Sequence, residues 1–293
     1  MDNVVGTGPA AAPGAAGAGE KTDESRRYFV RPVTAFGVTL VCYVALQVVA
    51  AVFMMFLGFG YALLPSYILA VVGPILLITR EHSPSVGKTL RLLPVKAAPM
   101  VFTLGASFSF ILLQYHVAGL LEKTFPMPTW IEDFLLDMTR IRTLTEGLRV
   151  VSGVVLAAAV AEELLFRGFL QGSLEHRRGR WFAIILTSLL FAVLHDPWRL
   201  VPVFFIGVLL GYLASRGGSI YYSMVAHAVT NGTSVAGLNM FALETNAEFS
   251  MPVALIPVMA LVFAVSILGF VRTVGAPGPG QSREPAGPPE PGK

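Results

Sequence analysis

The chain has 293 residues, of which 54% are hydrophobic and only 13% are charged. Soluble domains usually carry about 25% charged residues, so this composition excludes an ordinary soluble globular protein and indicates one that lies in a membrane. The net charge of +3 comes from basic residues that flank apolar segments, which argues against nucleic acid as a partner. A single cysteine, Cys42, excludes an intrachain disulfide and a cysteine-based metal site.

The order of apolar segments predicts an all-α transmembrane bundle of about eight spans between two tails. Residues 1–30 and 273–293 are rich in small residues and proline, and we expect both tails to be disordered. Residues 31–272 form the predicted transmembrane domain. No charge falls between Arg31 and Arg80, a stretch long enough for two spans. The other six are predicted at 98–121, 150–174, 181–195, 200–215, 219–241 and 251–271.

The segment between the third and fourth predicted spans has the pattern of an amphipathic helix. Its apolar residues follow helical spacing, and Thr129 with Glu132 predicts a capping box at its start. We expect this helix to lie on the membrane surface. Packing against a loop of the same protein is an equally good alternative.

Basic residues outside the spans predict the orientation of the chain. With eight spans and an internal N-terminus, most Lys and Arg residues collect on one side of the membrane. Because basic loops stay in the cytoplasm, we expect a multi-pass protein of the inner (plasma) membrane with both termini cytoplasmic.

Ionisable side chains within the fourth predicted span indicate a functional site. Such groups cost about 2.5–3.5 kcal/mol each at the centre of a membrane helix. Glu163 and Arg167 are four residues apart and share a helix face, so their pairing offsets much of this cost. Glu162 is turned about 100° away from Glu163 and needs another partner. Glu162 is therefore the candidate functional carboxylate.

Two later predicted spans add two histidines and an asparagine to these candidates. His195 ends the fifth span and alone would be typical of an interfacial histidine, whereas His227 and Asn231 alone would equally suit hydrogen bonds between helices. Together with Glu162 they indicate hydrolysis. A carboxylate beside an imidazole can deprotonate a water, and an imidazole with a carboxamide can donate hydrogen bonds to an oxyanion.

The same residues resemble the CPBP family, the CAAX proteases and bacteriocin-processing enzymes that are also called Abi proteins. Three family motifs, EExxxR, FxxxH and HxxxN, match in order Glu162–Arg167, Phe191–His195 and His227–Asn231. Each motif lies inside a predicted span, and the resemblance covers about residues 150–232. It implies an all-helical intramembrane fold and a glutamate-dependent protease.

The resemblance also implies roles by position. Glu162 and His195 would activate a water molecule, and His227 with Asn231 would stabilise the oxyanion. The supporting residues would be Glu163, Arg167 and Phe191, with Arg167 holding Glu163. We expect no metal or other cofactor. The alternative is a zinc ion bound by Glu162, His195 and His227.

The sequence therefore predicts an intramembrane endopeptidase that cuts membrane-associated proteins or peptides, with the substrate and the bilayer as its partners. A transporter or proton relay is one alternative, because buried glutamate and histidine residues also mark ion paths. A non-catalytic immunity or scaffold protein of the same family is another.

Overall fold

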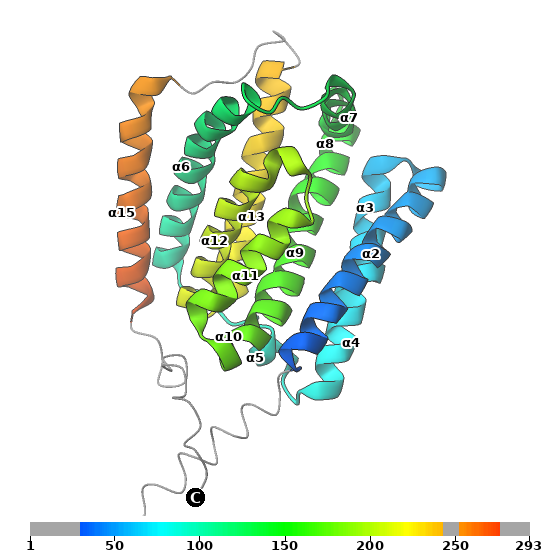
Figure 1. The fold of residues 1–293 in the computed structure, drawn as a ribbon, viewed down its shortest axis with the longest axis vertical. Coiled ribbons are helices and arrows are strands. Elements are labelled where there is room, and N and C mark those ends of the chain that lie inside the picture. Colours follow the sequence, from blue (N-terminus) through cyan, green and yellow to red (C-terminus); the bar gives the residue numbers. More distant parts are fainter. Residues whose placement is uncertain (1–29, 243–251, 276–293) are drawn as a thin grey trace, which may run out of the picture.

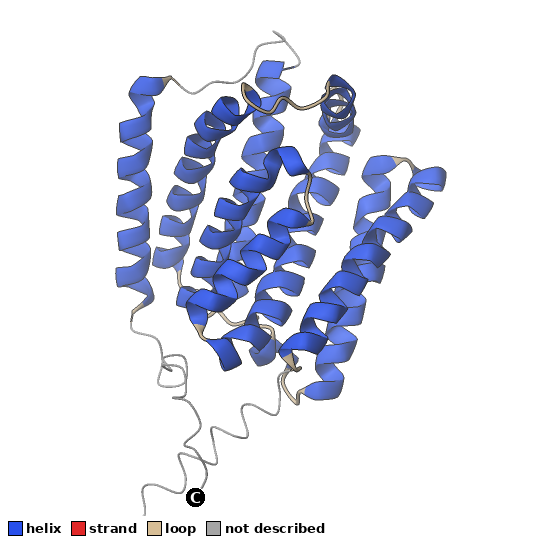
Figure 2. Ribbon diagram, in the orientation of Figure 1, coloured by secondary structure: helices blue, strands red, loops and turns tan. Residues whose placement is uncertain are grey.

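The computed structural model describes residues 30–242 and 252–275. The predicted tails, 1–30 and 273–293, lie almost wholly outside the described residues. Across the described ranges the chain is helical and contains no strand, so the predicted all-α fold is confirmed (Figures 1 and 2).

The N-terminal half of the bundle begins with a helical hairpin. Gly58 makes the sharp turn at φ 72°, a backbone conformation that suits glycine because it has no Cβ. This hairpin stands at one edge of the bundle (Figure 1). Its elements are α2 (Pro32–Leu57), α3 (Phe59–Tyr67), the π-helical η1 (Ile68–Val72) and α4 (Gly73–His82).

A long helical rod forms the centre of the fold. The short α5 (Val86–Thr89), the long α6 (Ala97–Glu122) and α7 (Thr129–Thr139) precede it. The rod runs without interruption through five elements, and two of these, η2 and η3, are π-helical and flank α9. They are α8 (Leu144–Val150), η2 (Val151–Ala157), α9 (Ala158–Glu163), η3 (Leu164–Gln171) and α10 (Gly172–Arg178).

Of the remaining helices, α11, α12 and α13 pack against this rod, whereas α15 packs against α6. The first, α11, has 14 residues and is about 21 Å long, which is shorter than the roughly 30 Å hydrocarbon core of a bilayer. The last, α15, stands at the edge opposite the hairpin (Figure 1). The elements are α11 (Arg180–Val193), η4 (Pro197–Arg199), α12 (Leu200–Gly217), α13 (Ile220–Gly237), η5 (Leu238–Ala242), η6 (Val253–Leu255) and α15 (Ile256–Val274).

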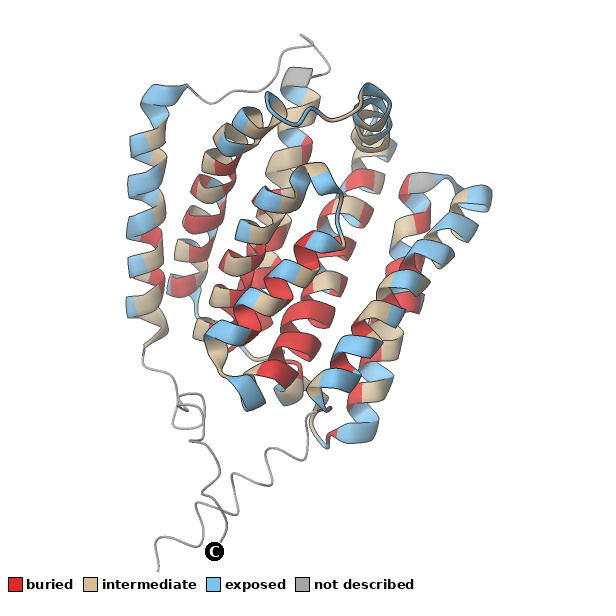
Figure 3. Ribbon diagram, viewed as in Figure 1, coloured by how far each residue is buried: buried red, intermediate tan, exposed pale blue. Residues whose placement is uncertain are grey.

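The distribution of polarity is that of a membrane protein. Large apolar side chains such as Val33 and Met55 are more than four-fifths exposed, whereas Glu163, Arg167 and Gln171 are fully buried. Buried residues concentrate along the central rod and α11–α13 (Figure 3). Lipid accepts apolar surface, and buried polar groups then find partners inside the bundle. The chain is therefore a multi-pass membrane protein.

The number of spans stays a prediction. Among the described residues, five helices are long and apolar enough to cross a membrane. The central rod contains charged residues and α11 is short, so neither qualifies by length and composition. The five are Pro32–Leu57, Gly60–His82, Ala97–Glu122, Pro197–Gly217 and Val253–Val274.

The predicted capping box at Thr129 is wrong. Pro128 precedes α7 as its N-cap and no side chain caps that helix. Helix α7 ends at Thr139, and the capping box forms where α8 begins, at Thr143 and Glu146. Thr143 has an extended backbone, which lets its hydroxyl accept the Glu146 N–H at 3.2 Å. No residue of α7 is buried, and its position on the membrane surface stays a prediction.

Candidate active site

The second glutamate of the EExxxR motif is held in a buried ion pair. Glu163 Oε1 lies 2.9 Å from Arg167 Nη1, as the four-residue spacing predicts, and both side chains are fully buried. Arg167 Nη2 also donates to the carbonyl of Gly207 on α12, at 3.3 Å. The Phe191 ring lies 4.5 Å from the guanidinium carbon. These contacts fix the Glu163 carboxylate and neutralise its charge.

His227 is oriented by that fixed carboxylate. Its Nδ1 lies 3.0 Å from Glu163 Oε1, and an ionised carboxylate can only accept a hydrogen bond, so Nδ1 carries the proton. The other ring nitrogen, Nε2, lies 3.8 Å from Glu162 Oε2. Glu163 therefore aims the imidazole of His227 at the first glutamate of the motif.

Glu162 has different surroundings from its neighbour. Among the described residues it has no Lys or Arg partner, and 17% of its side chain is exposed, compared with 0% for Glu163. The hydroxyl of Tyr67, at the end of α3, donates to Glu162 Oε1 at 2.8 Å. The opposite oxygen, Oε2, is separated from His227 by more than a hydrogen-bond length. One oxygen is thus held while the other is available to a reactant.

His195 follows the end of α11 and is also held through Nδ1. This atom lies 2.6 Å from the carbonyl oxygen of Phe191, which only accepts, so Nδ1 carries the proton. In the neutral ring, Nε2 then keeps its lone pair and can take a proton. The Phe191 ring packs 4.5 Å from the His195 ring and 5.9 Å from the His227 ring. Phe191 therefore contacts both imidazoles and the Arg167 guanidinium.

A cavity of about 230 Å³ lies between Glu162, Tyr67 and His195. Since one water occupies roughly 30 Å³, the cavity can hold several water molecules. Its walls come from α2, the end of α3, η1, α9, η3 and the turn after α11. The lining residues are Tyr43, Leu46, Gln47, Tyr67, Val71, Glu162, Leu165, Phe166, Leu194 and His195.

The four predicted catalytic residues are not all equally close to this cavity. Glu162 and His195 line it, whereas His227 lies beside Glu162 and is not part of the lining. Asn231 donates one amide N–H to the carbonyl of Val154 at 3.1 Å and does not line the cavity. The structure thus brings the predicted water-activating pair together, with the predicted oxyanion pair to one side.

The three residues of the zinc alternative are not grouped as a metal site in this structure. Within the described ranges, no three His, Cys, Asp or Glu side chains are placed so that they could hold a metal ion. Both imidazoles have Nδ1 engaged, by Glu163 for His227 and by a backbone carbonyl for His195, so Nε2 is the one nitrogen of each ring that could bind a metal. We derive no step through a metal, and its absence stays a prediction.

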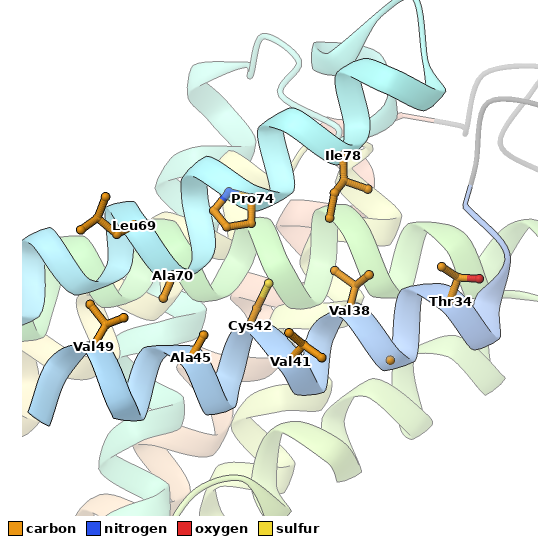
Figure 4. Close-up of a pocket in the computed structure, with 11 residues that line it drawn as sticks. Thr34, Val38, Val41, Cys42, Ala45, Val49, Leu69, Ala70, Pro74 and Ile78 are labelled. Atoms are coloured by element: carbon orange, nitrogen blue, oxygen red, sulfur yellow. The ribbon is translucent and has the colours of Figure 1, made fainter.

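A larger hollow lies on the other side of α2. It measures about 490 Å³ and lies between α2 and the continuous helix formed by η1 and α4 (Figure 4). Cys42, Ala45 and Pro74 are among its lining residues, which are almost all apolar. It contains no carboxylate or imidazole, so it offers no acid–base chemistry.

Sequence reasoning missed the contributions of α2 and α3. Tyr43 donates to the carbonyl of Leu194, Gln47 lines the cavity and Tyr67 binds Glu162. Each is a neutral polar residue within an apolar segment, and Tyr43 and Gln47 are one helical turn apart. A search for polar residues in apolar spans, without regard to charge, would have found them.

Comparison with known proteins agrees with this geometry. The apolar surface and the charged groups buried inside define a polytopic membrane protein, and its central helices match a family of endopeptidases. The matching family model is described as type II CAAX prenyl endopeptidase Rce1-like and covers residues 145–233. This range contains all three motifs, so the predicted family resemblance is confirmed over that part of the chain. No curated protein and no solved structure matches the chain.

Proposed function

We propose that the protein is an intramembrane endopeptidase that hydrolyses peptide bonds of membrane-associated proteins or peptides with a water activated by Glu162 and His195. One observation carries the proposal. Within the described part of the chain, a carboxylate without a Lys or Arg partner and an imidazole whose Nε2 makes no hydrogen bond line the same cavity, which has room for several water molecules.

In this mechanism Glu162 acts as the general base. It takes one proton from the bound water while the water oxygen bonds to the carbonyl carbon of the substrate. The tetrahedral intermediate collapses as the carbon–nitrogen bond breaks, and the proton passes to the departing amine. His195 is the second proton acceptor. General acid–base catalysis of this kind contributes about 10²–10⁴-fold to the rate.

His227 and Asn231 are the proposed donors to the oxyanion. Because His227 uses its Nδ1 proton on Glu163, it can donate from Nε2 only as an imidazolium. Asn231 has two amide protons and the Val154 carbonyl takes one, so one remains for the substrate. In this proposal the buried Arg167 and Glu163 hold His227 in place.

The proposed setting is the inner (plasma) membrane, with both termini cytoplasmic, no metal and no other cofactor. The excess of basic residues on the side of the termini supports this orientation. The partners are a membrane-associated peptide or protein substrate and the bilayer. A proton relay is the second candidate, because Arg167, Glu163, His227, Glu162 and Tyr67 form a polar chain whose one gap, of 3.8 Å, lies between His227 and Glu162.

Peptide cleavage by the purified protein tests the proposal. The wild type in detergent is given a panel of fluorogenic peptides, and Glu162→Ala is compared with Glu81→Ala, which changes an exposed carboxylate at the end of α4. We expect Glu162→Ala to lose at least about 10²-fold in kcat, because it removes the general base, and Glu81→Ala to lose nothing. A chelator should leave the wild-type rate unchanged.

Three results would contradict parts of this account. Unchanged cleavage by Glu162→Ala would refute the role of this carboxylate. Loss of activity with a chelator, restored by zinc, would overturn the metal-free mechanism. No cleavage of any peptide, together with proton flux through the protein in vesicles, would favour the proton relay.

A further inference from the structure

Helix α2 carries an exposed side-chain amide, Gln47, in the middle of an apolar membrane helix. At 1.5 Å per residue, Gln47 lies about 22 Å from Pro32 and about 15 Å from Leu57 along the helix axis. Half the hydrocarbon thickness of a bilayer is about 15 Å. Gln47 is therefore far from the headgroups on both sides, and a lipid headgroup is not its partner.

An amide at this depth needs a hydrogen-bond partner, because lipid chains offer none. The other polar residues of the helix show how the need is met. Thr39 donates to the carbonyl of Ala35 at 2.8 Å, and Tyr43 donates to the carbonyl of Leu194. Gln47 forms no hydrogen bond with any residue in the described part of the chain. Its donor and acceptor are available to a ligand.

The position of Gln47 indicates what that ligand is. Gln47 lines the same cavity as Glu162 and His195. Tyr43, one turn earlier on the same face of α2, also lines the cavity and binds the residue next to His195. A group bound by Gln47 therefore lies in the space where the scissile bond is placed by the proposed function.

An extended peptide backbone is chemically complementary to this amide. Each residue presents one N–H donor and one carbonyl acceptor, and a side-chain amide offers an acceptor and donors in return. We propose that Gln47 binds the backbone of the substrate peptide next to the scissile bond, with its side-chain oxygen accepting a backbone N–H. The inference rests on the proposed function. Because backbone groups are common to all residues, this contact selects for an extended chain at the active site and not for one side chain.

Ester analogues of a cleaved peptide test this role. In each analogue one backbone N–H near the scissile bond, outside that bond itself, is replaced by an ester oxygen, which removes one donor. kcat/KM is measured for the wild type, for Gln47→Leu and for Val48→Leu, which changes an exposed neighbour outside the cavity. We expect Gln47→Leu to lose about fivefold on the normal peptide, the size of one hydrogen bond, and Val48→Leu to lose nothing.

The decisive experiment combines the two changes, the ester analogue and Gln47→Leu. One ester analogue should lose about fivefold with the wild type and nothing more with Gln47→Leu, since both changes remove the same hydrogen bond. Equal losses in both proteins for every analogue, or unchanged kinetics in Gln47→Leu, would overturn the assignment. A shift in oligomeric state with unchanged kinetics would assign Gln47 to a contact between copies. A wild type that cleaves no peptide contradicts the proposed function itself.

Discussion

Glu162 and Glu163 are adjacent in the sequence but differ in almost every physical respect. Glu163 is fully buried, pairs with Arg167 and holds an imidazole. Glu162 is partly exposed, and its polar neighbours are the Tyr67 hydroxyl and Nε2 of His227, the same imidazole that Glu163 holds. Pairs of titratable groups in contrasting environments often divide catalytic and supporting roles between them. The helix turn of about 100° between neighbours produces this division.

Tyr67 should act by orienting Glu162. Its hydroxyl fixes Oε1 at 2.8 Å, which leaves Oε2 for the water. A hydrogen bond to a charged group contributes about 1.5–3 kcal/mol, so Tyr67→Phe should lower kcat by about 10- to 100-fold. KM should stay unchanged, because Tyr67 binds the base and not the substrate.

Steady-state kinetics of the purified variant measures this effect, with Tyr61→Phe as the control. Tyr61 lies on the same helix with half of its surface exposed. An unchanged kcat in Tyr67→Phe would show that Glu162 does not need this donor. A rise in KM alone would instead make Tyr67 part of the substrate-binding surface.

Which site residues could be predicted depends on their charge. Glu162, Glu163 and Arg167 stand out because burying a charge in lipid is costly, and the three motifs then identify the histidines. Tyr67 and Gln47 are neutral and lie outside the motifs, so the cost of burying a charge did not distinguish them in advance. Only the packing of α2 and α3 against α9 and η3 brings them to Glu162.

At the level of helices, most boundaries follow from hydropathy. The third span, predicted at 98–121, corresponds to α6 (Ala97–Glu122), and the fifth, predicted at 181–195, corresponds to α11 (Arg180–Val193). The break between α7 and α8 was missed, because the apolar spacing continues through it while Arg140 adopts an extended backbone, with ψ 133°. Side-chain periodicity does not report such a local backbone change.

The helices α11 and α12 approach closely at Gly207. A Cβ added there would lie 3.0 Å from Ser188 Cβ and 3.1 Å from its Cα, so α12 would have to move. The same residue accepts a hydrogen bond from Arg167. Small residues four apart in this helix predict such an approach, although the sequence does not identify the partner helix.

Alanine at this position should therefore destabilise the protein. Overpacking typically costs about 1–3 kcal/mol, so Gly207→Ala should lower the unfolding midpoint in detergent by several degrees. Gly37→Ala is the matched control, because nothing lies within 4 Å of its added Cβ. Equal midpoints for the two variants, measured by thermal unfolding, would show that α11 and α12 leave room for a Cβ at position 207.

For the molecule as a whole, the proposed active site joins two parts of the chain. The family match covers residues 145–233, which supply Glu162, His195 and His227. The hairpin of α2 and α3 lies outside that range and supplies the opposite wall of the cavity. The fold class follows from composition, whereas the meeting of the hairpin with the central rod depends on tertiary packing that the sequence pattern does not specify.

The source of the oxygen in the cleavage product tests the central claim most directly. A peptide is hydrolysed in water enriched in ¹⁸O, with the protein in excess so that each molecule turns over once, and the new C-terminal carboxylate is analysed by mass spectrometry. Because Glu162 is proposed to activate water and not to attack the substrate itself, each product should carry one ¹⁸O atom, and Glu162→Gln should form product at least about 10²-fold more slowly. Product without ¹⁸O, or product formed by Glu162→Gln at the wild-type rate, would contradict the account.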